Sequence, residues 1–195
     1  MKKFVITIAR GFGSGGKGIA RRLADELGIP CHEHDILTLA AERSGYDRKK
    51  FAEADEKVIR HSLLDTLSSS FVPNDTLFEY QAKVIRELAE KESCVIVGKA
   101  ADYILRDMDN VFSFYIEATR EVCLKNVMEK MDVTEAEAHE LITETDKFRA
   151  DYYKYYTGGN YWTNPVNYDL TLNSGKLGAE NCIKVIKNYV ELMTK

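Results

Sequence analysis

The sequence predicts an α/β protein in which helices cover a parallel sheet of five strands. Short apolar runs rich in β-branched residues, typical of buried strands, alternate with longer segments whose apolar residues recur at helical spacing. Strands separated by helices pair in parallel through right-handed crossovers. At 195 residues the chain is long enough for one such domain with a substantial core. It contains no internal repeat, low-complexity tract or linker, so we expect a single domain.

Each element is predicted from its apolar pattern. The predicted strands cover residues 4–9, 29–34, 94–98, 111–116 and 169–173. The predicted helices cover residues 19–28, 36–43, 47–67, 76–91, 99–106 (a short helix or turn), 119–131, 134 onward and 177–192. Two of these helices carry a signal for their start, because Thr76 precedes Glu79 and Thr134 precedes Glu137 at the spacing of a capping box.

Composition limits the classes of partner. The net charge is -4 and no basic tract exceeds a few residues, so we expect neither a nucleic-acid nor a membrane partner. The four cysteines are widely spaced without a C-x-x-C pair, which indicates small core residues in a reducing compartment. The chain has no 18-residue apolar run, and Met1 leads into a strand without a signal-peptide pattern. We therefore expect a cytoplasmic protein, and the oligomeric state does not follow from the sequence.

A glycine-rich stretch, residues 11–18, connects the first predicted strand to the first predicted helix. Two motifs overlap in it: the phosphate loop G-x-x-x-x-G-K, which ends at Lys17, and the dinucleotide fingerprint G-x-G-x-x-G. Both bring backbone N–H groups to an anion at the positive end of a helix. Lys17 favours the phosphate loop, because its ammonium reaches the β- and γ-phosphates of a nucleotide. The predicted ligand-binding residues are Gly11, Gly13, Ser14, Gly15, Gly16, Lys17, Gly18 and Ile19.

Further candidates follow from the geometry of a parallel sheet, in which ligands lie beyond the carboxyl ends of the strands. Asp35 follows the second strand, where it is either a ligand to substrate or magnesium, or the N-cap of the next helix. Lys99 and Asp102 follow the third strand and are candidates for contacting the substrate. His32 and His34 alternate beside Asp35, but no distant third ligand accompanies them, so the pattern disfavours a histidine metal site.

The composition changes between residues 143 and 163. Five of the eleven tyrosines fall there together with Arg149, and two glycines at 158 and 159 end the predicted helix. Such a helix suits a lid over a phosphate site, since basic groups stabilise a transferring phosphoryl group and aromatic groups exclude water. Arg149 is therefore a candidate catalytic residue. The alternative for the tyrosines is packing, since Tyr152 and Tyr156 share a helical face.

Three blocks of the sequence resemble the cytidylate kinase-like proteins, a branch of the P-loop nucleoside monophosphate kinases. The blocks are IARGFGSGGK at 8–17, VIVGKAAD at 95–102 and DKFRADYYKYYTG at 146–158. The resemblance covers nearly the whole chain and implies a P-loop NTPase-type three-layer sandwich with strand order 2-3-1-4-5. It also implies a division of the chain into a core at 1–34, 92–131 and 161–195, an acceptor-binding helical region at about 35–91 and a lid at about 132–160.

The resemblance further implies ATP-dependent phosphoryl transfer, with Mg²⁺, to a small acceptor such as the nucleoside monophosphate CMP. Lys17 would hold the donor phosphates, and Arg149 would be the catalytic arginine of the lid. Lys99 stands where cytidylate kinases carry an arginine that contacts the acceptor phosphate. Ile19 replaces a threonine whose hydroxyl lies near magnesium, and only Asp35 matches the Asp-Thr-Gly sequence expected after the second strand. The metal ligands are therefore not predicted.

Three functions are open on these patterns. The kinase is favoured by Lys17 and by the three blocks together. An inactive nucleotide-binding regulatory protein is the alternative that Ile19 and the altered acceptor segment suggest. A dehydrogenase is the third, because the dinucleotide fingerprint overlaps the phosphate loop and Glu33 and Asp35 lie at plausible positions in the sequence for a ribose contact.

Overall fold

The computed structural model describes residues 3–33, 36, 38–39, 71 and 73–195, and these form a five-stranded parallel sheet. The strands are β1 (Val5–Arg10), β2 (Cys31–His32), β3 (Cys94–Val97), β4 (Val111–Glu117) and β5 (Leu170–Asn173). Their order is β2-β3-β1-β4-β5, which confirms the predicted fold class and strand order. This order differs from the 3-2-1-4-5-6 order of dinucleotide-binding domains and so disfavours the dehydrogenase.

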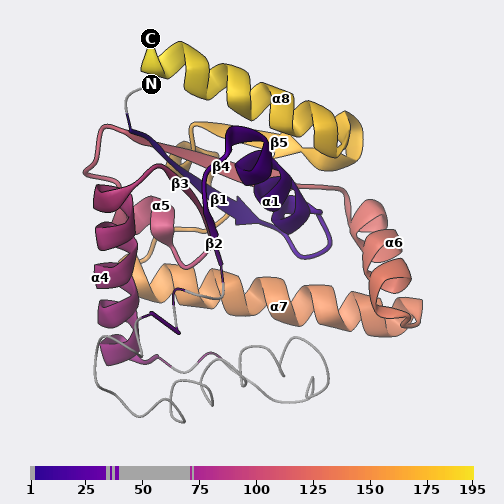
Figure 1. Cartoon of the computed structure of the whole chain (residues 1–195). Coiled ribbons are helices and arrows are strands. Elements are labelled where there is room, and N and C mark those ends of the chain that lie inside the picture. The colour runs from indigo at the N-terminus through magenta and orange to yellow at the C-terminus, as the bar shows by residue number, and fades with distance from the viewer. Residues whose placement is uncertain (1–2, 34–35, 37, 40–70, 72) are drawn as a thin grey trace.

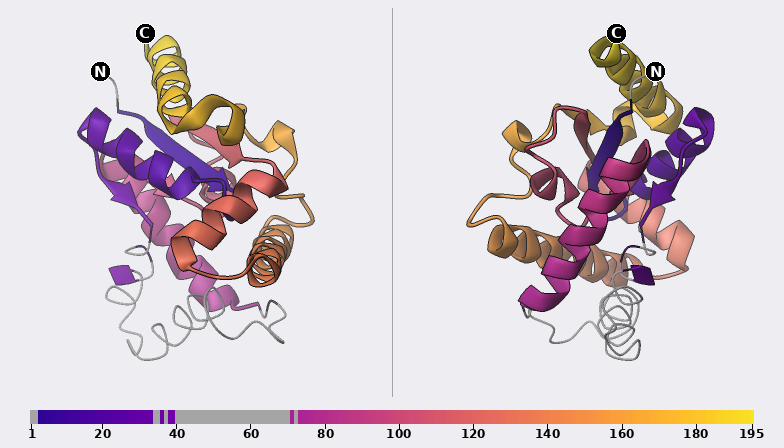
Figure 2. Two further views of the ribbon diagram at one scale, coloured as in Figure 1. Left: turned by 90° about the vertical axis from the view of Figure 1, so that its right-hand side faces the viewer. Right: turned by 60° about the vertical axis from the view of Figure 1, so that its left-hand side comes forward.

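Helices cover both faces of the sheet and one of its ends (Figure 1). They are α1 (Gly16–Leu27), α4 (Asp75–Lys91), α5 (Ala101–Ile104), α6 (Arg120–Met131), α7 (Glu135–Tyr156) and α8 (Ser174–Thr194), with a short 3-10 helix at Pro165–Asn167. The views in Figure 2 agree that α1 and α8 lie on one side of the sheet and α4 on the other. α7 crosses the end of the sheet toward which β1 runs, and α6 packs against it.

Two hydrophobic clusters hold these layers together. On the first face, Ile6 and Ile8 of β1 pack with Leu23 of α1 and Ile183 of α8. On the second face, residues of β3 and Val5 pack against α4 and α5. β1 is therefore buried on both faces, as a central strand of a parallel sheet must be, and its end carries the glycine-rich loop.

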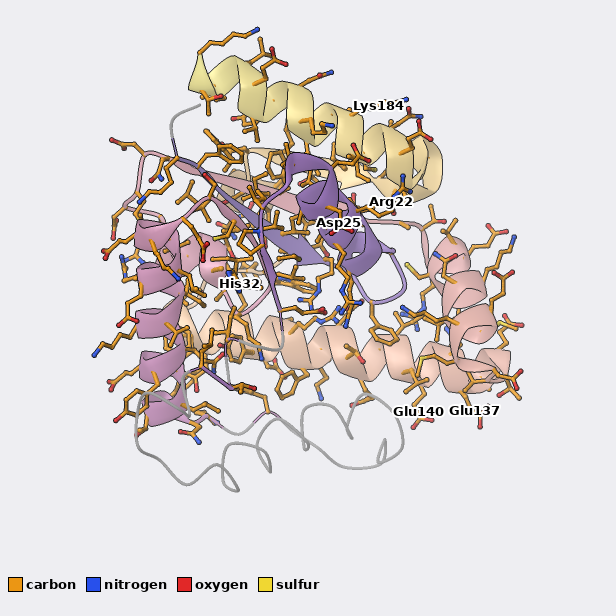
Figure 3. The ribbon with its side chains drawn as sticks, viewed as in Figure 1. Arg22, Asp25, His32, Glu137, Glu140 and Lys184 are labelled. Atoms are coloured by element: carbon orange, nitrogen blue, oxygen red, sulfur yellow. The ribbon has the colours of Figure 1, made fainter. Side chains whose placement is uncertain are left out.

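The starts of the helices test the predicted caps. The capping box of α7 is confirmed, since Thr134 and Glu137 bond to each other's backbone N–H groups. Figure 3 shows Glu137 and Glu140 on the side of α7 that faces away from the sheet. The predicted cap of α4 is wrong: Asn74 caps this helix by accepting a hydrogen bond from the N–H of Leu77.

The remaining expectations have mixed outcomes. The predicted helices at 36–43 and 47–67 lie almost wholly outside the described residues. Cys94, Cys123 and Cys182 are buried, as expected for small core residues, and Cys31 is partly buried. α8 begins before its predicted start, with an irregular turn at Gly178. In the described ranges, no helix combines the length and the apolarity that crossing a membrane requires.

Candidate functional site

The glycine-rich loop between β1 and α1 has the backbone geometry of an anion-binding site. Gly13 and Gly15 have φ angles of 83° and 79°, which side-chain-bearing residues rarely adopt. Gly15, the N-cap of α1, has no side chain to cap the helix, the first turn contains no acidic residue, and Ser14 Oγ accepts a hydrogen bond only from the Gly16 N–H, at 3.3 Å. The positive end of the helix is thus open to an external anion, in contrast to α6 and α7, which carry glutamates in their first turns.

Other elements hold the loop in place. A Cβ on Gly13 would lie 2.7 Å from the carbonyl oxygen of Cys123 in α6, so α6 packs directly on the loop backbone. Asn126 of α6 donates a hydrogen bond to the Gly13 carbonyl at 2.8 Å. Ser174, at the start of α8, donates to the Ser14 carbonyl at 2.6 Å. The loop is therefore fixed from two sides, and an anion would find its N–H groups already positioned.

Lys17, in the first turn of α1, places its ammonium beside the end of β2. Its Nζ lies 2.7 Å from Oε1 of Glu33, and Arg21 of the next helical turn lies 2.9 Å from Oε2 of the same carboxylate. The Glu33 side chain is only 9% exposed. A buried carboxylate thus holds two cations of α1 on the side of the helix that faces the site.

Ile19 lies in the core. Its side chain is 1% exposed and packs in the cluster between the sheet, α1 and α8. Its N–H donates to the carbonyl of Gly15 within the helix. The side chain of Ile19 therefore contributes to the core, and its N–H is used within the helix; the assignment of Ile19 to ligand binding stays a prediction.

Arg149 reaches the loop from α7. Its Nη1 donates to the carbonyl oxygen of Arg10 at 3.0 Å and to Oδ1 of Asp146 at 3.2 Å. The same Asp146 oxygen accepts a hydrogen bond from the N–H of Phe12 at 2.9 Å. Burial raises the pKa of Asp146 and lowers the pKa of Arg149, although each opposes the shift of the other. The structure therefore brings the predicted lid arginine to the end of β1, where the glycine-rich loop begins.

The other predicted substrate residues are not all directed at this site. Asp102 accepts a hydrogen bond from the Tyr153 hydroxyl at 2.6 Å, and burial raises the pKa of its carboxyl to about 6. This hydrogen bond connects α5 to α7, and the assignment of Asp102 to substrate stays a prediction. Lys99 follows β3 with a positive φ of 59°. Asp35 lies outside the described residues.

Three of the four tyrosines of α7, Tyr152, Tyr153 and Tyr156, pack within the protein, as the packing alternative predicts, whereas Tyr155 is 50% exposed. Tyr156 stacks on Phe78 of α4 with ring centroids 4.0 Å apart, and its hydroxyl accepts a hydrogen bond from the N–H of Asn74 at 2.7 Å. Tyr152 contacts both of these rings edge to face. These contacts attach α7 to α4, so α7 is fixed at the glycine loop and at its far end.

Three residues of this site were not among the residues predicted for a kinase site. Arg10, Glu33 and Asp146 lie around Lys17 and Arg149, and each is charged and largely buried. Arg10 and Glu33 lie at or just after the ends of β1 and β2, which is the signal that selected Asp35. Asp146 lies one helical turn before Arg149 and opens the block at 146–158 that resembles the family, but its carboxylate was given no role.

The fold and the loop define a class: an α/β protein of P-loop type, with a glycine loop and a lysine at the first helix, as in nucleotide and small-molecule kinases. The sequence model of the cytidylate kinase-like family matches residues 5–176. The chain therefore belongs to the cytidylate kinase-like family. It is 26% identical over 193 residues to the cytidylate kinase of Archaeoglobus fulgidus, a match that covers 96% of this chain and 94% of the relative.

Solved structures agree with this fold. An uncharacterized protein from Eubacterium ventriosum is 28% identical, with a TM-score of 0.75 over 97% of this chain and 99% of that one. The shikimate kinase of Acinetobacter baumannii, in complex with shikimate, has a TM-score of 0.54 at 14% identity and covers 97% and 93% of the two chains. At that identity the likeness shows the fold alone.

Proposed function

We propose that this protein is an ATP-dependent kinase that transfers the γ-phosphoryl group of ATP to a nucleoside monophosphate such as CMP. The observation that carries the proposal is the hydrogen bond from Arg149 to the carbonyl oxygen of Arg10, the residue immediately before the glycine loop. Cationic groups from α1 and α7 thus surround one anion-binding loop. Family membership and the named relative support the choice of a nucleotide acceptor.

The proposed mechanism depends on position and charge. The loop N–H groups bind the donor phosphates, and Lys17 exchanges its contact with Glu33 for phosphate oxygens. Arg149 neutralises charge that develops on the transferring phosphoryl group. α7 forms the lid and, with its aromatic contacts to α4, excludes water from the reacting atoms. The acceptor oxygen attacks the γ-phosphorus and ADP leaves, without a covalent protein intermediate.

Magnesium, when bound, neutralises the negative charge of the donor phosphates. The described residues contain no group of three His, Cys, Asp or Glu side chains that is arranged to hold a metal ion. Ile19 has no hydroxyl, and Glu33 is the carboxylate that lies beside Lys17. The described residues therefore fit a magnesium ion that would be held mainly by phosphate oxygens and water, as is usual for this cation, with Glu33 as a described carboxylate beside Lys17.

An inactive nucleotide-binding regulatory protein is the second candidate. The burial of Ile19 favours it, because the position that carries a threonine hydroxyl in monophosphate kinases here contributes only to the core. This candidate predicts ATP binding without phosphoryl transfer to any acceptor.

A coupled assay of ADP release against CMP, dCMP, UMP, AMP and small hydroxyl acceptors, shikimate included, separates the two candidates. We expect release that rises with one nucleoside monophosphate. Lys17→Ala should lower kcat/KM by about 10²- to 10³-fold, the loss typical of removing one electrostatic donor. Lys125→Ala, an exposed lysine of α6, is the matched control. ATP binding with no acceptor-dependent release would favour the regulatory protein, and unchanged turnover of Lys17→Ala would exclude the proposed mechanism.

A further inference from the structure

Asp146 of α7 bonds both to the glycine-rich loop and to the predicted catalytic arginine. Its Oδ1 accepts a hydrogen bond from the backbone N–H of Phe12 at 2.9 Å and another from Nη1 of Arg149 at 3.2 Å. The same Nη1 donates to the carbonyl oxygen of Arg10 at 3.0 Å. Because residues 10 and 12 flank Gly11, these three hydrogen bonds close a ring that joins the start of the loop to α7.

The spacing within α7 lets one carboxylate oxygen serve both partners. Asp146 and Arg149 are three residues apart, which places them on the same face of the helix. Phe12 meets this face with its side chain as well, since the guanidinium carbon of Arg149 lies 5.6 Å from the centroid of the Phe12 ring. The same ring packs against the buried cluster between α6 and α7. The start of the loop is therefore held to α7 by a backbone hydrogen bond and by side-chain packing.

This arrangement leaves much of the Arg149 guanidinium available to a ligand. Arginine has five N–H donors, and both contacts described above use Nη1. Within the described ranges no acceptor bonds to its Nε or Nη2, and the side chain is 21% exposed. A guanidinium that is fixed through one nitrogen presents its opposite edge in a single orientation, as contact with two phosphate oxygens requires.

The position of α7 itself does not depend on Asp146. The far end of the helix is attached to α4, because the ring of Tyr156 stacks on that of Phe78. Near its start, Nη2 of Arg120 in α6 donates to the carbonyl oxygen of His139 at 2.6 Å. Loss of the Asp146 carboxylate would therefore leave the helix in place, but it would remove one of the two contacts that orient the guanidinium and the bond to the start of the loop.

We propose that Asp146 is a positioning residue of the kinase site, which fixes the guanidinium of Arg149 relative to the start of the glycine loop and so to the donor phosphates. This inference rests on the proposed kinase function and deepens it, because it identifies what aligns the lid arginine with the donor. The rate depends steeply on such alignment, since a displacement of about 1 Å can cost about 10²-fold. Asp146 does not itself contact the nucleotide, so its effect on the rate passes through Arg149.

Two substitutions separate the charge of Asp146 from its hydrogen bonds. Asp146→Asn keeps an acceptor oxygen and removes the negative charge, whereas Asp146→Ala removes both. Each is made in the wild-type protein and in Arg149→Met, which gives a double-mutant cycle. The matched control is Glu140→Gln, at an exposed carboxylate of the same helix that faces away from the sheet (Figure 3). Thermal unfolding of every variant reports its stability.

Steady-state kinetics with the best acceptor from the ADP-release assay give kcat and the KM for ATP. We expect kcat to fall about 10- to 100-fold in Asp146→Ala and about 3- to 10-fold in Asp146→Asn, while the KM for ATP changes less than about threefold. In the Arg149→Met background, Asp146→Ala should change kcat less than about threefold, because the group through which it acts is absent. Glu140→Gln should retain wild-type kinetics.

Several results would overturn the inference and leave the kinase standing. A fall in kcat that is equally large with and without Arg149 would show that Asp146 acts through the structure in general. Wild-type kcat in Asp146→Ala would show that it does not act at all. A higher KM for ATP with wild-type kcat would assign Asp146 to donor binding. If Asp146→Ala does not fold, the cycle with Asp146→Asn decides by the same criteria.

A protein that transfers nothing would reject the proposed function, and calorimetry would then decide the positioning role. The ratio of the affinities for a non-hydrolysable ATP analogue and for ADP measures contacts to the γ-phosphate without turnover. A ratio that falls in Asp146→Ala and in Arg149→Met, but no further in the double variant, would support the positioning role. A ratio that Asp146→Ala leaves unchanged would overturn it.

Discussion

The Asp102–Tyr153 contact predicts an unusual dependence of stability on pH. Burial raises the pKa of the Asp102 carboxyl from 3.8 to about 6, against hydrogen bonds from Tyr153 and from two backbone N–H groups that lower it. Between pH 4 and 6 the folded protein holds this proton and the unfolded chain does not. The contribution of Asp102 to the free energy of unfolding therefore falls as pH rises through this window. Above about pH 6 the carboxylate is ionised in the folded protein, and the full destabilisation from its buried charge is present.

The magnitude follows from the shift. About two pKa units correspond to about 3 kcal/mol. Asp102→Asn is neutral at every pH and should lack this slope, so the variant should gain up to about 3 kcal/mol relative to wild type between pH 4 and pH 8. The side-chain N–H₂ of the new asparagine would face the donors that now bond to the Asp102 carboxylate. This mismatch lowers the free energy of unfolding of the variant by the same amount at every pH, so it cancels when the values at pH 4 and pH 8 are compared.

Urea unfolding followed by the fluorescence of Trp162 measures this difference. Trp162 is the single tryptophan, and it is buried edge-on against Tyr115. Asp107→Asn, at an exposed aspartate, is the control for loss of a surface carboxylate. If the free-energy difference between Asp102→Asn and wild type is the same at pH 4 and pH 8, the carboxyl does not titrate as described and our account of the α5–α7 contact is wrong.

Two further predictions concern the loop and the lid. Gly13→Ala should lower the free energy of unfolding by about 1–3 kcal/mol and weaken ATP binding. The reason is that the new Cβ would lie 2.7 Å from the Cys123 carbonyl oxygen, on a backbone with positive φ. Gly18→Ala is the control: no atom lies within 4 Å of the added Cβ, so this variant should not be destabilised in the same denaturation experiment. Arg149→Lys should lower kcat by about 10- to 100-fold with little change in the KM for ATP, since one ammonium cannot replace a planar fork held by Asp146 and the Arg10 carbonyl. Steady-state kinetics with unchanged kcat would show that Arg149 does not act in the transition state.

The arrangement of the strands was predictable from the sequence because burial imposes a local pattern. β1, β3, β4 and β5 lie within about a residue of their predicted ranges. β2 is much shorter than predicted, at two residues, because it is an edge strand that pairs only with β3. The N-cap of α4 also differs from the prediction. Asn74 and Thr76 can both cap a helix, and in the structure the helix begins after Asn74, whose side chain accepts a hydrogen bond from the N–H of Leu77.

The sequence by itself determined the fold class and the glycine loop, because strand burial, helical periodicity and glycine φ angles are set by neighbouring residues. Only the tertiary structure decided what surrounds that loop. Arg149 meets the Arg10 carbonyl across 139 positions, and Asp102 meets Tyr153 across 51. The burial of the Ile19 side chain between the sheet, α1 and α8, and the packing of the Arg10 side chain against Gly98, likewise depend on how separate elements cross. The end of a strand is a local signal that separates Arg10 from Arg22 within α1, but the burial of the Arg10 charge depends on its distant neighbours, which no local pattern specifies.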